Sequence, residues 1–148
     1  MDRFTWGIVA GVLLLVAAGI GTAALVGSRE SAPDLSTPSG VALAFELAVD
    51  RDDADSAWSL LASSAQGKTT FDRFSDRVGT GSDRVRLSTD DEVIDGDTAR
   101  VTVARYYPPS SGLFSGSGYT NRATVRLSRE DGQWRVTEPS NSYLLSDR

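Results

Sequence analysis

The pattern of apolar and polar positions divides the chain into three parts. The first is an unbroken apolar run, residues 4–28, in which no side chain carries a charge. A short polar stretch follows, and then a longer part in which apolar residues recur first at helical spacing and later at every second position, the spacing of strands. We predict a transmembrane anchor (1–28), a linker (29–36) and one α+β domain (37–148).

The apolar run is long enough to cross a membrane as a helix. At about 1.5 Å per residue it reaches about 37 Å, and the hydrocarbon core of a bilayer is about 30 Å thick. A cleavable signal peptide is the alternative, because the small residues Gly21, Ala23 and Ala24 can form a cleavage site. The run exceeds the about 7–15 apolar residues of such peptides, which favours retention. The sequence has no cysteine, which excludes a lipid-modified cysteine after cleavage.

Charges beside the apolar run predict its orientation. Arg3 and the amino terminus precede the run and are offset by Asp2, whereas Arg29 and Glu30 follow it. The positive-inside rule then places the N-terminus in the cytoplasm. We expect a single-pass protein of the cell membrane that contacts lipid through one helix, with its C-terminal domain outside the cytoplasm.

Apolar residues at intervals of three and four predict three helices at the start of the domain. Thr37 and Pro38 form an N-cap followed by a proline, which the first turn of a helix accepts. Asp53 caps a second, short helix, and residues 69–72 have capping-box spacing ahead of a third. The apolar residues expected on the inner faces are Val41, Ala44, Phe45, Ala48, Ala57, Trp58, Leu60, Leu61, Phe71, Phe74 and Val78.

In the second half, β-branched residues alternate with polar ones, which predicts about four strands. Asp95-Gly96 and Asp131-Gly132 predict hairpin turns, because glycine adopts the positive φ that such turns need. A long loop is expected over residues 108–121. Helices followed by hairpins predict an α+β fold, a cone of about three helices packed on a curved antiparallel sheet of about four strands.

Several segments together resemble a known superfamily. They are the helices RDDADSAWSLL and FDRFSDRV, the strand DGDTARVTV and the closing hairpin REDGQWRVTEP. The domain resembles the nuclear-transport-factor-2-like (NTF2-like) superfamily, a cystatin-like α+β cone, and in particular the lumazine-binding-like and SnoaL-like accessory domains that bacteria carry behind a membrane helix. The resemblance covers residues 38–144. The superfamily includes isomerases, dehydratases and cyclases as well as ligand-binding and structural proteins, so the fold implies no single function.

Composition excludes several classes of function. Asp and Glu together number 20 against 15 Lys and Arg, and the net charge of −5 argues against a nucleic-acid-binding face. Because the chain has neither Cys nor His and no acids at calcium-loop spacing, we expect no metal site. Phosphate-loop and dinucleotide-binding glycine patterns are absent, so we expect no cofactor. The lack of histidine weakens an enzyme hypothesis, since enzymes of the superfamily that this domain resembles use Asp or His to transfer protons.

Four side chains are candidates for a ligand pocket or a partner contact. Glu46 is the one acid that has apolar neighbours on both sides within a predicted helix, which makes it a candidate pocket carboxylate. A solvent-facing position on that helix is the ordinary alternative. Tyr106, Tyr107 and Tyr143 can hydrogen-bond a ligand or simply close the core at strand ends. No residue is assigned a catalytic role.

The predicted long loop carries a second group of candidates. Leu113, Phe114 and Tyr119 stand among residues typical of flexible segments. They suit a lid over the cone, a membrane contact or a partner contact, and an unstructured insertion is the alternative.

Two surfaces are further candidates. Arg100, Arg126 and Arg135 share the polar face of the strands, where they form either a cationic face for an anionic partner or lipid headgroup, or an ordinary outer face balanced by nearby acids. Gly7 and Gly11 are four residues apart in the apolar run, a spacing that lets two membrane helices approach closely. A partner membrane protein or a second copy of this chain is the expected contact.

The leading functional hypothesis is a non-catalytic, membrane-anchored extracytoplasmic domain that binds a partner protein or a small apolar ligand. The first alternative is a single-span accessory subunit of a larger membrane complex, in which the apolar helix docks. The second alternative is an isomerase- or cyclase-type enzyme of the same fold. Co-purification distinguishes the first two, and the interior of the cone bears on the third.

Overall fold

The computed structural model describes residues 32–79, 85–109 and 117–146. The described helices and strands belong to one compact unit, Pro33–Arg148. No helix within the described residues has the length and apolarity needed to span a bilayer. The predicted anchor lies outside the described residues.

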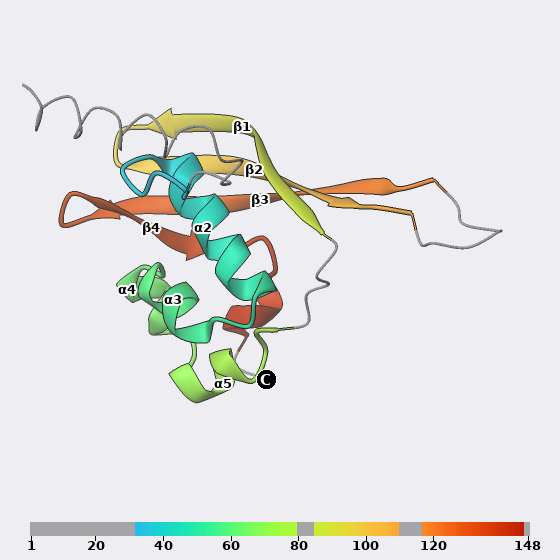
Figure 1. Cartoon of the computed structure of the whole chain (residues 1–148). Helices are drawn as coiled ribbons and strands as arrows, with labels where there is room; N and C mark the ends of the chain where they lie inside the picture. Colours follow the sequence, from blue (N-terminus) through green and yellow to red (C-terminus); the bar gives the residue numbers. More distant parts are fainter. Residues whose placement is uncertain (1–31, 80–84, 110–116, 147–148) are drawn as a thin grey trace, which may run out of the picture. The chain divides into compact units, whose positions relative to one another are not determined.

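Four helices form the first half of the described domain (Figure 1). They are α2 (Pro38–Asp50), α3 (Ala54–Ser59), α4 (Ser63–Gln66) and α5 (Phe71–Ser75). The side chains of Thr37, Asp53 and Thr70 cap α2, α3 and α5 by accepting a backbone N–H of the first turn. The sequence predicted three helices here, one fewer than the structure has in its described residues. The sequence misses α4 because this single turn buries only Ala65 and shows no apolar period.

Four strands form one antiparallel sheet. They are β1 (Arg86–Asp95), β2 (Thr98–Tyr107), β3 (Tyr119–Glu130) and β4 (Gln133–Glu138), in the order β1-β2-β3-β4. The α+β fold with four antiparallel strands is therefore confirmed. The loop between β2 and β3 is shorter than predicted, because Tyr119, Thr120 and Asn121 pair with β2 as part of the sheet.

Both predicted hairpin turns are present, and the backbone explains their residues. Asp131 and Gly132 have φ of 50° and 79°, and a two-residue turn with both φ positive is type I′. The loop between β1 and β2 consists of Gly96 and Asp97, with φ of 57° at Gly96. A Cβ atom would meet nothing within 4 Å at either glycine, so the backbone angle and not lack of space favours glycine there.

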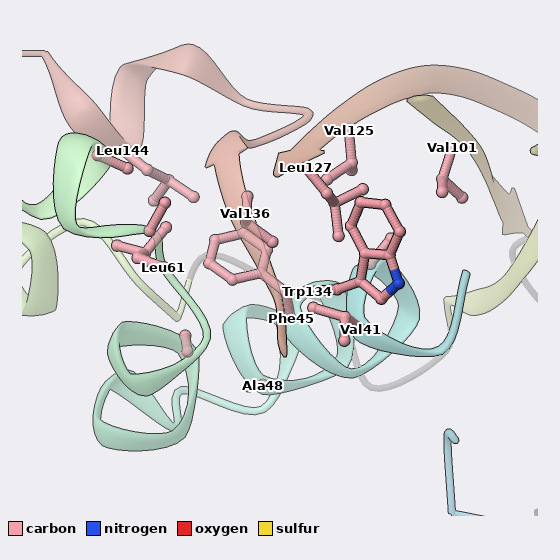
Figure 2. Packing of buried hydrophobic residues seen from close by; sticks show 14 of the residues in the cluster. Val41, Phe45, Ala48, Leu61, Val101, Val125, Leu127, Trp134, Val136 and Leu144 are labelled. Carbon is pink, nitrogen blue, oxygen red and sulfur yellow. The ribbon is translucent and has the colours of Figure 1, made fainter. Parts of the chain in front are cut away.

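One face of the sheet packs against the helices, and α2 crosses it (Figure 1). Buried residues alternate along β2 and β3, as at Val101 and Val103 on one strand and Val125 and Leu127 on the next. Figure 2 shows part of the resulting core. Its labelled residues are Val41, Phe45, Ala48, Leu61, Val101, Val125, Leu127, Trp134, Val136 and Leu144.

The chain between α3 and α4 extends the sheet beyond β4. Leu61 forms a parallel bridge with Val136. The N–H of Ala62 donates to the carbonyl oxygen of Val136 at 2.8 Å, and the N–H of Val136 donates to the carbonyl oxygen of Leu60 at 2.9 Å. These bonds attach the short helices to the sheet through backbone as well as apolar contacts.

Candidate functional site

Helix α2 is held to β1 at its first turn by Glu92. The Oε2 atom of Glu92 accepts hydrogen bonds from the N–H of Ser39, at 2.7 Å, and from the Ser39 hydroxyl. A carboxylate is favourable there because the first N–H groups of a helix lack intrahelical acceptors and carry the positive end of the helix dipole. This contact helps to fix where α2 crosses the sheet and therefore where Glu46 lies.

Glu46 faces the sheet and is buried. Its exposed fraction is 1%, so the solvent-facing interpretation of this position is wrong. The buried face of α2 is rotated from the predicted one, because Ala42 and Glu46 are buried beside Phe45 whereas Ala44 is half-buried. A buried carboxylate needs a cationic or hydrogen-bonding partner, and the facing strand supplies one.

That partner is Arg105, at the next inward position of β2 after Val103. Its Nη2 donates a hydrogen bond to Oε2 of Glu46, and its Nη1 lies 3.7 Å from Oδ1 of Asp50. Burial alone would lower the pKa of Arg105, but the negative charge and hydrogen bond of Glu46, with smaller effects of Tyr107 and Asp50, outweigh burial and raise that pKa. The side chain therefore stays cationic.

Glu46 depends strongly on this one arginine. Its second oxygen, Oε1, is buried and has no hydrogen-bond partner among the described residues. A buried polar atom left in this state costs about 1–3 kcal/mol. The ion pair is thus incompletely satisfied, and such groups in native structures call for an explanation beyond packing.

Arg105 lies in the wall of an open cavity of about 290 Å³. The cavity lies between the end of α2, the inner face of β2 and β3, and the 3-10 helix η1 (Ser142–Leu145). Its polar lining residues include Asp50, Arg77, Arg105, Tyr107, Asn121 and Asn141. Apolar side chains such as Ala123 and Leu144 complete the wall. This mixed lining suits a polar ligand better than the small apolar ligand expected from the sequence.

The candidate tyrosines do not form a single site. Tyr107 lines the cavity, and its ring stacks on that of Tyr119, its partner on β3, with ring centroids 4.6 Å apart and planes 12° from parallel. Tyr106 immediately precedes Tyr107 on β2, and its side chain therefore points to the opposite face of the sheet. The guanidinium of Arg77, which lines the cavity, lies over the ring of Tyr143, with its Cζ atom 4.9 Å from the ring centroid.

The three arginines of the predicted cationic face are held in different ways. Arg100 and Arg126 are directly opposite each other on β2 and β3. Arg126 pairs with Glu138 at 2.6 Å between Nη1 and Oε2, and Arg135 donates to the carbonyl oxygen of Ser59. Two of the three are thus occupied by neighbours within the domain. Binding of an anion by this face stays a prediction.

Four sequence candidates fall outside the described residues. They are Leu113 and Phe114 of the predicted loop, and Gly7 and Gly11 of the predicted anchor. Their proposed contacts stay predictions.

Several residues of the site were not predicted from the sequence, among them Arg105, Asn121 and Asp50. Arg105 extends the inward alternation of Val101 and Val103, and this spacing alone places it on the core face. Asn121 was assigned to the loop, although it pairs with Arg105 across β2 and β3. Asp50 is the last residue of α2, and no local pattern marks it as a neighbour of Arg105. The position of a charged residue at the end of an apolar alternation is the signal that could have found this site.

Comparison with known proteins bears on the fold alone. No family model matches the sequence, and no curated protein matches it. A SEC-C motif-containing protein from Rhodopseudomonas palustris has a similar solved structure, with a TM-score of 0.54 and 13% identity over 71% of this chain and 78% of that one. An NTF2-like transpeptidase from Campylobacter jejuni gives a TM-score of 0.50 and 18% identity over 68% of this chain and 97% of that one. The second of these likenesses supports an NTF2-like α+β fold.

Proposed function

We propose that this chain is a membrane-anchored, extracytoplasmic binding domain, with the cavity beside Arg105 as its binding site and without chemical conversion of the ligand. The observation that carries the proposal is that the wall of an open cavity contains a guanidinium held in place by a buried carboxylate, that of Glu46. A side chain fixed in advance loses little conformational entropy when it binds a ligand.

The energetics of the ion pair support a binding role. Replacement of a buried ion pair by apolar residues of similar size is often neutral, or stabilises a protein by about 1–4 kcal/mol. Phe45 precedes Glu46 on α2, Val103 precedes Arg105 on the same face of β2, and both belong to the buried apolar core, so apolar side chains would suit these positions. A charged pair at this place therefore favours the positioning of Arg105 over a gain in stability.

The carboxylates near the cavity favour binding over proton transfer. Glu46 accepts a hydrogen bond from Arg105, and Asp50 lies 3.7 Å from the same guanidinium. A general base needs to reach a substrate proton, and both acids are directed at Arg105 instead. The sequence contains no histidine that could take their place. The isomerase- or cyclase-type enzyme therefore stays the second alternative, after the accessory subunit.

A cavity-filling variant tests the binding proposal. Ala123 lines the cavity from β3, and its neighbour Thr124 is exposed on the opposite face. We would screen the full-length chain against small compounds by ligand-induced thermal shift and repeat the measurement on Ala123→Phe and Thr124→Phe. Shifts that disappear only in Ala123→Phe would support the cavity as the binding site. The proposal fails if no compound shifts the unfolding temperature, or if both variants respond like the wild type.

The proposed membrane location is supported by the charge-free run of residues 4–28. Leu14→Arg places a charge in the middle of this run, and Leu35→Arg places the same charge at an exposed position of the described chain. We expect the wild type and Leu35→Arg to resist alkaline extraction from membranes, and Leu14→Arg to be released. Digestion of the domain by protease added to intact cells would support the external orientation. Recovery of the wild type in the soluble fraction would contradict the anchor.

Co-purification in mild detergent separates the free-standing binder from the accessory subunit. A stoichiometric complex with other membrane proteins would favour the subunit. Recovery of the chain alone, or as pairs of itself, would favour the binder.

A further inference from the structure

We infer that the cavity beside Arg105 binds an uncharged sugar unit of a glycan, with the stacked rings of Tyr107 and Tyr119 as the platform for the sugar ring. This inference rests on the proposed function, because it names the ligand class of the same site. Three properties of the site lead to it: the balance of charge, the hydrogen-bonding groups and the aromatic pair.

The balance of charge around the cavity disfavours strongly charged ligands. Two negative charges, on Glu46 and Asp50, balance the two positive charges of Arg77 and Arg105. An anionic ligand would compete with both carboxylates for Arg105, and a cationic ligand would meet two arginines. A ligand that forms many hydrogen bonds without a net charge meets neither obstacle.

The polar groups suit hydroxyl groups. Arg105 and Asn121 are directly opposite each other on the inner face of β2 and β3, and both line the cavity. A guanidinium offers a planar set of donors, and an amide offers both donors and an acceptor. Neighbouring hydroxyls of a sugar ring both donate and accept, so they can bond with two such groups at once. Asn141 adds a second amide to the same wall.

The aromatic pair supplies an apolar surface beside these groups. Tyr107 and Tyr119 form the cross-strand pair next to Arg105 and Asn121 on the same face of the sheet, two residues further along each strand. Tyr107 lines the cavity, while Tyr119 is 62% exposed and extends the stack outward. The C–H groups on one side of a sugar ring pack well against an aromatic face, whereas its hydroxyls point to the rim. The cavity volume of about 290 Å³ lies at the lower end of small-molecule sites, which suits one or two rings.

Calorimetry of the full-length chain tests the inference, in a polyoxyethylene detergent because common alkyl glycoside detergents carry sugars themselves. The probes are cellotetraose, maltotetraose and two matched pairs whose members share one sugar backbone and differ in charge and one small substituent: chitotetraose with its deacetylated form, and methyl-esterified tetragalacturonate with its free acid. We expect at least one uncharged oligosaccharide to bind, and the uncharged member of each pair that binds to bind more tightly than the charged member.

Variants on the two faces of the sheet make the test specific. Tyr119→Ala is expected to weaken binding by about tenfold, and Tyr119→Phe, which keeps the ring, to bind nearly as the wild type does. Tyr106→Ala removes a tyrosine from the opposite face and serves as the matched control. The unfolding temperature of each variant shows whether it is folded; Tyr119→Phe keeps the comparison informative if Tyr119→Ala is not.

Three results of the oligosaccharide titrations would overturn the inference. They are the absence of binding to every oligosaccharide, equal binding by Tyr119→Ala and the wild type, and tighter binding of the charged probes. If uncharged peptides such as tetraglycine amide bind in place of sugars, the inference also fails. Compounds of another class that shift the wild type but not Ala123→Phe would leave the proposed function standing while the sugar inference falls.

Discussion

The guanidinium of Arg105 donates a hydrogen bond to the buried carboxylate of Glu46, and so connects the middle of the sheet to the helix that crosses it. The two residues differ in exposure, with 21% of the side-chain surface of Arg105 but only 2% of that of Glu46 accessible to solvent. The arginine therefore presents part of its surface to the cavity, whereas the glutamate is buried and holds the guanidinium in position. This asymmetry makes the consequences of substituting each partner different.

Removal of Arg105 alone should destabilise the domain strongly. Arg105→Met leaves the carboxylate of Glu46 buried without its cation, and the loss of one partner of a buried ion pair costs about 3–5 kcal/mol. The double variant Glu46→Met/Arg105→Met should recover most of this loss, because no charge is then left in the core. Urea unfolding followed by tryptophan fluorescence measures both. A double variant as unstable as Arg105→Met would show that the pair itself stabilises the fold.

Glycine is required at one position in the first turn of α2. A Cβ atom on Gly40 would lie 1.9 Å from the carbonyl oxygen of Asp34, so either the helix or the preceding turn would have to move. We expect Gly40→Ala to lower the free energy of unfolding by about 1–3 kcal/mol. Gly67→Ala is the control, because its nearest atom would be 3.5 Å away, and it should be neutral or slightly stabilising. Equal effects of the two substitutions would contradict this account of Gly40.

Acid should weaken the cap of α3. Hydrogen bonds from the side chain and the backbone N–H of Ser56 lower the pKa of Asp53 below 3.8. A carboxyl whose folded pKa is lowered contributes stability above its unfolded pKa and loses it as the pH falls through the folded value. Asn caps helices as well as Asp but does not titrate. Asp53→Asn should therefore lose less stability than the wild type between about pH 5 and pH 2. Ser36 lowers the pKa of Asp34 in the same direction, so part of the acid sensitivity should remain.

The outer face of the sheet contains a repulsive pair that can be relieved. Arg100 and Arg126 are directly opposite each other, and like charges in such pairs destabilise a sheet. Arg100→Gln should stabilise the domain by about 0.2–1 kcal/mol at low salt, and the gain should shrink as salt is added. Arg126→Gln relieves the same repulsion but also loses the pair with Glu138, so its net effect should be smaller. A loss of stability in Arg100→Gln would contradict this interpretation.

Local signals in the sequence predicted much of the fold. The caps at Thr37 and Asp53 and the turn at Asp131-Gly132 depend on one or two residues and their immediate neighbours, and the structure has all of them where expected. Helix α4 was missed because one turn shows no period, and the start of β3 because a strand end is defined by its partner and not by its own composition.

The candidate site was harder to predict, because it depends on contacts distant in the sequence. Glu46 and Arg105 are separated by 59 positions, and no local sequence pattern around either residue predicts their contact. The sequence singled out Glu46 by its apolar neighbours, but the burial of that carboxylate follows only once β2 is placed beneath α2. Tyr107 was found as a candidate, and its pairing with Tyr119 required the register of β2 and β3.

The two edges of the sheet have a consequence for crowded surfaces. One edge, β4, is covered by the chain's own backbone at Leu61, while β1 is the terminal strand at the other side of the described sheet. A register shift at Asp90 and the acids Asp91 and Glu92 mark β1, so two such strands from neighbouring molecules would meet with like charges and mismatched hydrogen bonds. If the chain is tethered to a membrane, as we propose, its copies diffuse in two dimensions and collide often, and this arrangement then opposes the growth of continuous sheets between neighbours.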